Sequence, residues 1–96
     1  MKFITFEGID FCGKSTQIKL LEKYLLDNNK KVYLVREPGG TKISESIREI
    51  LLDNKNNNLF IETELLLFSS ARAQLTREII KPYLKKGYYV LSDRFS

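Results

Sequence analysis

The sequence predicts an α/β protein in which a parallel sheet of three strands is flanked by helices. Short apolar runs alternate with segments of helical spacing, in the order strand, helix, strand, helices, strand. Right-handed crossovers between parallel strands bring the C-terminal ends of the strands to one edge. Segments 8–15, 36–41 and 93–94 are rich in glycine or charge and fall at that edge, where open sheets bind ligands. We therefore expect one domain over residues 1–96 with a single site.

Three segments in the first part of the chain carry the local signals. Residues 2–7 are an apolar run that ends at a glycine, which is typical of a buried first strand. Apolar residues at positions 18, 21 and 25 predict a helix that ends near residues 27–29. Residues 32–35 are almost free of polar side chains, which predicts a second strand covered on both faces.

The middle of the chain is predicted to form a loop and a second helix. Pro38 and the two glycines after it break regular structure, so residues 36–41 are expected to form a loop. Residues 54–58 are a polar run that predicts a surface turn. Apolar side chains at helical spacing mark the helix between them: Ile43, Ile47, Ile50 and Leu51.

The last part of the chain predicts a long helix and a third strand. Thr63 is expected to cap that helix, which runs through Ile79, bends at Pro82 and ends at Gly87. Residues 88–91 form the strand, and its C-terminal end delivers a serine, an aspartate and an arginine at positions 92–94.

The composition is that of an ordinary globular chain. Hydrophobic residues make up 43% and charged residues 29%, which excludes the disordered and fibrous classes. The net charge of +4 favours an anionic partner, and both nucleotides and nucleic acids fit it. With a single cysteine and no histidine, an internal disulfide and the usual zinc patterns are excluded. The first apolar run is far too short for a signal peptide or a membrane span, so we expect a cytoplasmic protein without a membrane partner.

Residues 8–15 have the spacing of a phosphate-binding loop. Glycines at both ends let backbone N–H groups point at phosphate oxygens. Lys14 is expected to reach the β- and γ-phosphates, and the Ser15 hydroxyl to ligate Mg²⁺. The loop follows a strand and opens a helix whose positive end faces the same phosphates. The residues expected to bind the triphosphate are Gly8, Ile9, Asp10, Phe11, Cys12, Gly13, Lys14, Ser15 and Thr16.

Asp93 and Arg94 end the third predicted strand. A carboxylate at that point is typical of the magnesium-organising group of phosphate-loop enzymes. The alternative for Asp93 is a solubilising charge or a helix cap. Arg94 beside it favours the functional reading, because a guanidinium at this edge faces the phosphates.

Five blocks of sequence, taken together, resemble the thymidylate kinase family in order and spacing. They cover nearly the whole chain, so the resemblance is specific although each block alone is weak. The blocks are Phe6-Glu7-Gly8-Ile9-Asp10, Gly13-Lys14-Ser15-Thr16-Gln17, Arg36-Glu37-Pro38-Gly39-Gly40-Thr41, Leu66-Leu67-Phe68 followed by Ala71-Arg72, and Ser92-Asp93-Arg94-Phe95. The resemblance implies the P-loop nucleotide-kinase fold and phosphoryl transfer from ATP to dTMP, giving dTDP for dTTP synthesis.

The resemblance also implies roles for individual residues. Lys14, Arg94 and Asp10 would be catalytic, with Asp10 facing the sugar of dTMP and Arg94 gripping the acceptor phosphate. Phe68 would stack on thymine and Arg72 would donate hydrogen bonds to the base. The monophosphate side would be lined by Arg36, Glu37 and Pro38, and the magnesium ion would be organised by Ser15 and Asp93.

Several alternatives stay open on the sequence. The chain resembles the N-terminal half of the family's fold, so we expect it to be inactive alone and the complete enzyme to be a homodimer that binds no nucleic acid. Another nucleoside or nucleotide kinase, such as a deoxynucleoside kinase, fits the same loop. A basic nucleic-acid-binding module and an inactive regulatory fragment also fit. Phe68 could instead pack in the core beside Leu65 and Leu75 while Arg72 reaches solvent.

Overall fold

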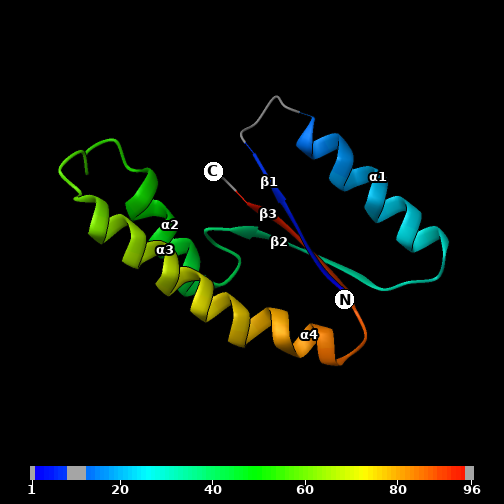
Figure 1. The fold of residues 1–96 in the computed structure, drawn as a ribbon. Helices are drawn as coiled ribbons and strands as arrows, with labels where there is room; N and C mark the ends of the chain where they lie inside the picture. The colour runs from blue at the N-terminus through cyan, green and yellow to red at the C-terminus, as the bar shows by residue number, and fades with distance from the viewer. Residues whose placement is uncertain (1, 9–12, 95–96) are drawn as a thin grey trace.

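A computed structural model describes residues 2–8 and 13–94 of the chain, and it confirms the predicted architecture (Figure 1). Its three strands form one parallel sheet in the order β1-β3-β2. Within the described residues, no helix is both long and apolar enough to cross a membrane. In chain order the elements are β1 (Phe3–Glu7), α1 (Lys14–Asp27), β2 (Val32–Glu37), α2 (Lys42–Leu52), α3 (Ile61–Leu75), a π-helical segment (Thr76–Ile80), α4 (Lys81–Lys85) and β3 (Tyr89–Arg94).

Helices lie on both faces of the sheet. In Figure 1, α1 lies on one side of the strands, and α2, α3 and α4 lie on the other. The main apolar cluster fills the second side, where Leu75 and Val90 are fully buried beside Val35 and Ile80. Burying such side chains is the dominant favourable term in folding, so this cluster fixes α3 and α4 on the sheet.

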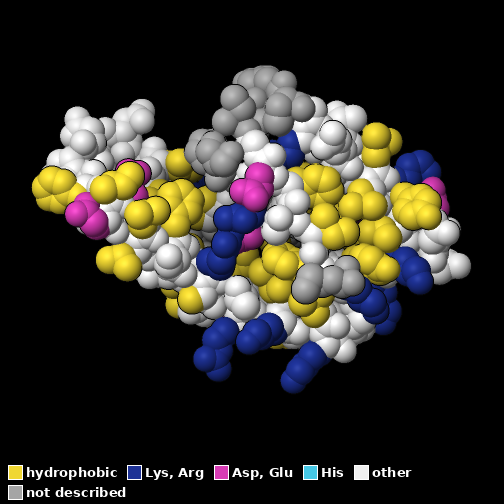
Figure 2. Space-filling view, viewed as in Figure 1, with side chains coloured by type: hydrophobic (Ala, Val, Ile, Leu, Met, Phe, Trp, Pro, Cys, Tyr) yellow, Lys and Arg dark blue, Asp and Glu magenta, His cyan; other side chains and the backbone are white. Residues whose placement is uncertain are grey.

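The α1 face is covered less completely than the sequence predicts. Ile18 and Leu25 of α1 are buried, but Leu34 of β2 is 45% exposed. The prediction that residues 32–35 are covered on both faces is therefore wrong for the described part of the chain. The reason is that β2 lies at the edge of the sheet and α1 alone covers this face. Figure 2 shows that apolar side chains remain at the surface here.

Two predicted boundaries also differ from the structure. β2 continues through Arg36 and Glu37, which were expected in a loop, because they pair with Asp93 and Arg94 of β3. α3 begins at Ile61, so Thr63 lies inside the helix and does not cap it. The sequence reading also missed a true cap.

That cap is Thr41, at the start of α2. Its side-chain oxygen accepts a hydrogen bond from the Ser44 N–H at 3.0 Å, which satisfies one of the unpaired donors of the first turn. Ser44 in turn donates from its hydroxyl to the Ala71 carbonyl at 2.7 Å and is fully buried. These bonds tie α2 to α3 directly beneath the segment that follows β2.

The end of the long helix changes its winding before Pro82. The π-helical segment Thr76–Ile80 lies directly before α4, in which Pro82 is the second residue. Proline has no N–H to donate to the preceding turn, so the regular bonding pattern cannot continue through it. Gly87 follows α4 with a φ of +87°, a left-handed conformation that glycine adopts readily, and the chain turns into β3.

The register of the strands sorts the polar residues between the two faces. Glu7, Arg94 and Glu37 stand in one row across the sheet, and Phe6, Asp93 and Arg36 stand in the next. Because successive residues of a strand point to opposite faces, these rows face opposite ways. The first row faces α3, and the second faces α1.

Candidate active site

Lys14 and Asp93 lie side by side at the C-terminal edge of the sheet. The Lys14 ammonium lies 2.7 Å from the Asp93 carboxylate. It also donates to the Gly8 carbonyl at 2.7 Å and to the Arg94 carbonyl at 3.1 Å. An ammonium has three protons, and all three have partners. Lys14 is also only 5% exposed, so its side chain is held in a fixed place.

The N-terminus of α1 is free to receive an anion. Gly13 has a φ of +83°, a left-handed conformation that favours glycine, and no atom of the described residues lies within 4 Å of the position that a Cβ would take. Among the described residues, no side chain caps the first turn, and no acidic residue lies in it. Its N–H groups and the positive helix end therefore suit phosphate oxygens. Ser15 and Thr16 are exposed at this end. Four predicted loop residues lie outside the described part of the chain: Ile9, Asp10, Phe11 and Cys12.

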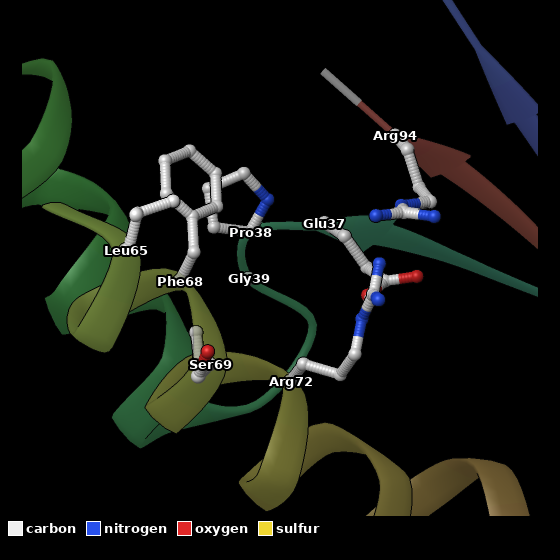
Figure 3. A pocket seen from close by; sticks show the side chains of 9 residues that line it. Glu37, Pro38, Gly39, Leu65, Phe68, Ser69, Arg72 and Arg94 are labelled. Atoms are coloured by element: carbon white, nitrogen blue, oxygen red, sulfur yellow. The ribbon is translucent and has the colours of Figure 1, made fainter. Parts of the chain in front are cut away.

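A second site lies between α3 and the sheet edge. It is a cavity of about 250 Å³ lined by Glu37, Pro38, Gly39, Leu65, Phe68, Ser69, Ala71, Arg72 and Arg94. Figure 3 shows Phe68 and Arg72 reaching in from α3 and Arg94 from β3. Phe68 keeps 37% of its surface exposed and Leu65 keeps 60%, so neither is a core residue. A ring and two guanidinium groups thus line one open pocket.

Glu37 forms the polar wall of this pocket. The residue is only 6% exposed, and both of its carboxylate oxygens are bonded. One accepts from the Arg72 Nε at 2.7 Å, and the other accepts from the Ser92 hydroxyl at 2.6 Å. Arg94 has a different ion-pair partner, because its Nη1 lies 3.6 Å from the Glu7 carboxylate. Its guanidinium is therefore held less tightly than that of Arg72.

Arg36 lies on the other face of the sheet and does not line this pocket. It borders a groove beside α1 together with Ser15 and Asp93. Its Nε donates to Glu45 at 3.1 Å, a second bond joins its Nη2 to the same carboxylate, and the Gly40 N–H donates there at 2.7 Å. Chiefly through the hydrogen bonds with Arg36, the pKa of Glu45 falls to about 2, and the pKa of Arg36 rises.

The oxygen donors at the loop suit magnesium bound together with a nucleotide. No cluster of three or more metal-binding side chains occurs within residues 2–8 and 13–94. In the described part of the chain, the Ser15 hydroxyl and the Asp93 carboxylate, whose side chain is 42% exposed, lie beside the α1 N-terminus. Mg²⁺ usually takes one or two protein oxygens and completes its shell with phosphates and water, so this small set fits it.

Sequence reasoning missed three residues that shape these sites. Ser92 bonds Glu37, Glu45 holds Arg36, and Arg48 donates from Nη1 to the Pro38 carbonyl at 2.8 Å. Strand alternation offered a signal for Ser92, since it places Ser92 on the same face as Arg94. No local pattern marks the other two, because their partners lie nine and ten positions away in a different element.

Known proteins match the chain over almost its whole length. The family model described as thymidylate kinase matches residues 6–96. The thymidylate kinase of Thermosipho africanus is 62% identical over 98% of this chain and 46% of its own length, and that of Thermosipho melanesiensis is 60% identical over the same shares. The crystal structure of thymidylate kinase from Ehrlichia chaffeensis superposes with a TM-score of 0.82 at 47% identity, over 97% of this chain and 52% of that one. The chain spans about half the length of the curated relatives it matches.

Proposed function

The chain belongs to the thymidylate kinase family, and we propose that it carries the phosphate-binding and acceptor-binding residues of an enzyme that converts ATP and dTMP to ADP and dTDP. One observation carries the proposal. Two cation-lined sites open at the same edge of one sheet, Lys14 at the α1 N-terminus and the pocket with Arg72 and Arg94. A kinase that phosphorylates a monophosphate needs two such sites, one for each nucleotide.

On the donor side, Lys14 would exchange its bond to Asp93 for the β- and γ-phosphates of ATP. The backbone N–H groups at the start of α1 would bind the same phosphates. A magnesium ion held by Ser15 and Asp93 would neutralise charge on these oxygens. The described loop residues that contribute here are Gly8, Gly13, Lys14, Ser15 and Thr16, with Ile9, Asp10, Phe11 and Cys12 completing the loop.

On the acceptor side, Arg94 would bind the phosphate of dTMP. A phosphate oxygen of dTMP attacks the γ-phosphorus, the bond from that phosphorus to the β–γ bridging oxygen breaks, and ADP leaves with the electron pair. Lys14 and Arg94 would stabilise the charge that develops on both sides of the transferred group. Asp10 would hold the deoxyribose, and Glu37 and Pro38 would border the acceptor pocket, whereas Arg36, which was expected there, lines the groove beside α1.

The base would lie between Phe68 and Arg72. These two side chains are one turn apart on α3 and line the same cavity. The ring offers a stacking surface, and a guanidinium has only donors to offer, so it suits the carbonyl of thymine and not the amino group of cytosine. We therefore propose that Arg72 selects dTMP over dCMP.

We also propose that the complete enzyme is a cytoplasmic homodimer. Large apolar side chains stand exposed on and beside α2 and α3, where Figure 2 shows them grouped. Phe60 is 76% exposed and Leu66 is 68% exposed. A second copy of the chain would remove such a patch from water. Sedimentation of the complete enzyme at micromolar concentration would give the mass of two chains, and a single-chain mass would exclude the dimer.

The proposal is tested with a polypeptide of the relatives' full length. Residues 1–96 of this chain replace the matching segment of the Thermosipho africanus relative, and ATP consumption is followed with dTMP, dCMP or thymidine as acceptor. We expect turnover with dTMP at a rate within about tenfold of that of the unmodified relative. The 96-residue chain alone should show no turnover, because its acceptor pocket is open to water. Phosphorylation of thymidine but not of dTMP would instead identify a deoxynucleoside kinase.

A further inference from the structure

We propose that Glu37 and Ser92 are positioning residues that hold the Arg72 guanidinium in the orientation needed to read the pyrimidine base. The inference rests on the proposed function, because it concerns the residue that we propose selects dTMP. In this proposal, the Glu37 carboxylate binds Arg72 and not the substrate, and Ser92 contributes to the specificity for the base. The chain of contacts is short: hydroxyl to carboxylate to guanidinium.

The three side chains differ in burial in a way that suits this role. Ser92 is 0% exposed and Glu37 is 6% exposed, whereas the Arg72 side chain is 47% exposed. A buried carboxylate is costly unless it is paired and hydrogen-bonded, and both Glu37 oxygens are bonded. A pair that served stability alone would have no need to expose its arginine. Here the carboxylate lies inside and the guanidinium faces the cavity.

The hydrogen bond between Arg72 and Glu37 uses the Nε atom of Arg72 and not its Nη atoms. Arginine carries five N–H donors in a rigid plane, and Glu37 takes the one on Nε. This bond restricts the orientation of the guanidinium beside the carboxylate. Figure 3 shows the guanidinium against the Glu37 carboxylate, with Arg94 on its other side and Phe68 farther along α3. Among residues 2–8 and 13–94, the Nη atoms of Arg72 have no hydrogen-bond partner, so their four N–H donors are available to a base in the pocket.

The sheet itself sets the place of the carboxylate. Glu37 ends β2, and Ser92 pairs in register with Val35 two residues earlier, so both side chains face α3. Ser92 also stands two residues before Arg94, which we propose binds the acceptor phosphate. The residue that reads the base is therefore tied to the strand that holds the phosphate. Pre-organisation of this kind lowers the entropy lost when the substrate binds.

The test separates positioning from a general structural role by a double-mutant cycle. In the full-length polypeptide described above, we compare Glu37→Gln, Ser92→Ala, Arg72→Ala and the double variant Glu37→Gln with Arg72→Ala. Glu37→Gln should raise the KM for dTMP about tenfold and reduce the preference for dTMP over dCMP, with kcat and the KM for ATP within about twofold. In the Arg72→Ala background the same change should cost less than about twofold, because Glu37 then has no guanidinium to position.

The control and the contrary outcomes are distinct. Asp27→Asn breaks an exposed ion pair with Lys23 on α1 and should leave every constant unchanged. A Glu37→Gln effect of equal size in both backgrounds would overturn the inference, because Glu37 would then act without Arg72. If Arg72→Ala leaves the preference for dTMP over dCMP unchanged, Arg72 does not select the base. If the parent polypeptide fails to phosphorylate dTMP, the proposed function itself is wrong.

A second measurement does not depend on turnover. In NMR spectra of the 96-residue chain, the Arg72 Nε–H should give a resolved signal that exchanges slowly with water. We expect Ser92→Ala, which removes one buried hydroxyl, to speed that exchange about tenfold, and Glu37→Gln to do so further. Fast exchange of the Arg72 Nε–H in the unmodified chain, or an unchanged exchange rate in Ser92→Ala, would refute the positioning of Arg72 by Glu37 and Ser92. This holds even if Glu37→Gln fails to fold.

Discussion

Replacing Glu45 by glutamine should lower the stability of the chain near neutral pH, and should lower it less in strong acid. Glu45 receives two bonds from Arg36 and one from the Gly40 N–H, which together fix the segment between β2 and α2. Glutamine keeps the shape of the side chain but loses the charge and one of the two acceptor oxygens. The variant therefore removes the ion pair together with at least one of its hydrogen bonds.

The magnitude follows from the pKa of Glu45, which falls from its ordinary value of 4.5 to about 2 in the folded chain. A depressed pKa stabilises the folded state above the unfolded pKa, and this contribution is lost as the pH falls from about 4.5 to about 2. The full shift would correspond to about 3 kcal/mol. Because the Glu45 side chain is 36% exposed, water screens the pair, and we expect about 1 kcal/mol.

The assay is urea unfolding of the 96-residue chain, followed by circular dichroism at pH 6 and at pH 2. The unmodified chain should be more stable than Glu45→Gln by about 1 kcal/mol at pH 6, and this difference should fall to less than about half at pH 2, where the Glu45 carboxyl is about half protonated in the folded chain. Asp27→Asn serves as the matched control, because its partner Lys23 is exposed and its loss should cost less than about 0.5 kcal/mol. A difference between the unmodified chain and Glu45→Gln that is the same at both pH values would refute the reasoning.

Four further predictions concern single positions. Lys14→Ala should reduce turnover of the full-length polypeptide by about 10²–10³-fold, measured at saturating ATP and dTMP, because one charge contact in the transition state is lost. Arg94→Ala should raise the KM for dTMP more than the KM for ATP, and equal increases would place Arg94 elsewhere. Asp93→Asn should shift the magnesium titration of activity to higher concentration, and an unchanged titration would exclude its role. Gly40→Ala should destabilise the chain by about 1–3 kcal/mol in urea, because the new Cβ would lie 2.6 Å from Leu75 at a φ of +95°.

The elements that the sequence located well are those with strong local signals. The phosphate-binding loop motif, the helix after it and the apolar strands were found because glycine spacing and side-chain periodicity depend only on neighbouring residues. Boundaries were less accurate where pairing overrode local preference. Arg36 and Glu37 look like the start of a loop beside Pro38, yet they extend β2 because β3 offers them a partner strand.

By itself, the sequence determined the parallel α/β fold and the grouping of charged residues at one sheet edge. Only the tertiary structure decided which partner each charged group has. It placed Arg36 with Glu45 on one face, and Arg72 with Glu37 and Ser92 on the other. The physical reason is that strand register and alternation choose the face of each side chain, and the partners come from elements up to 55 positions apart that no local pattern relates.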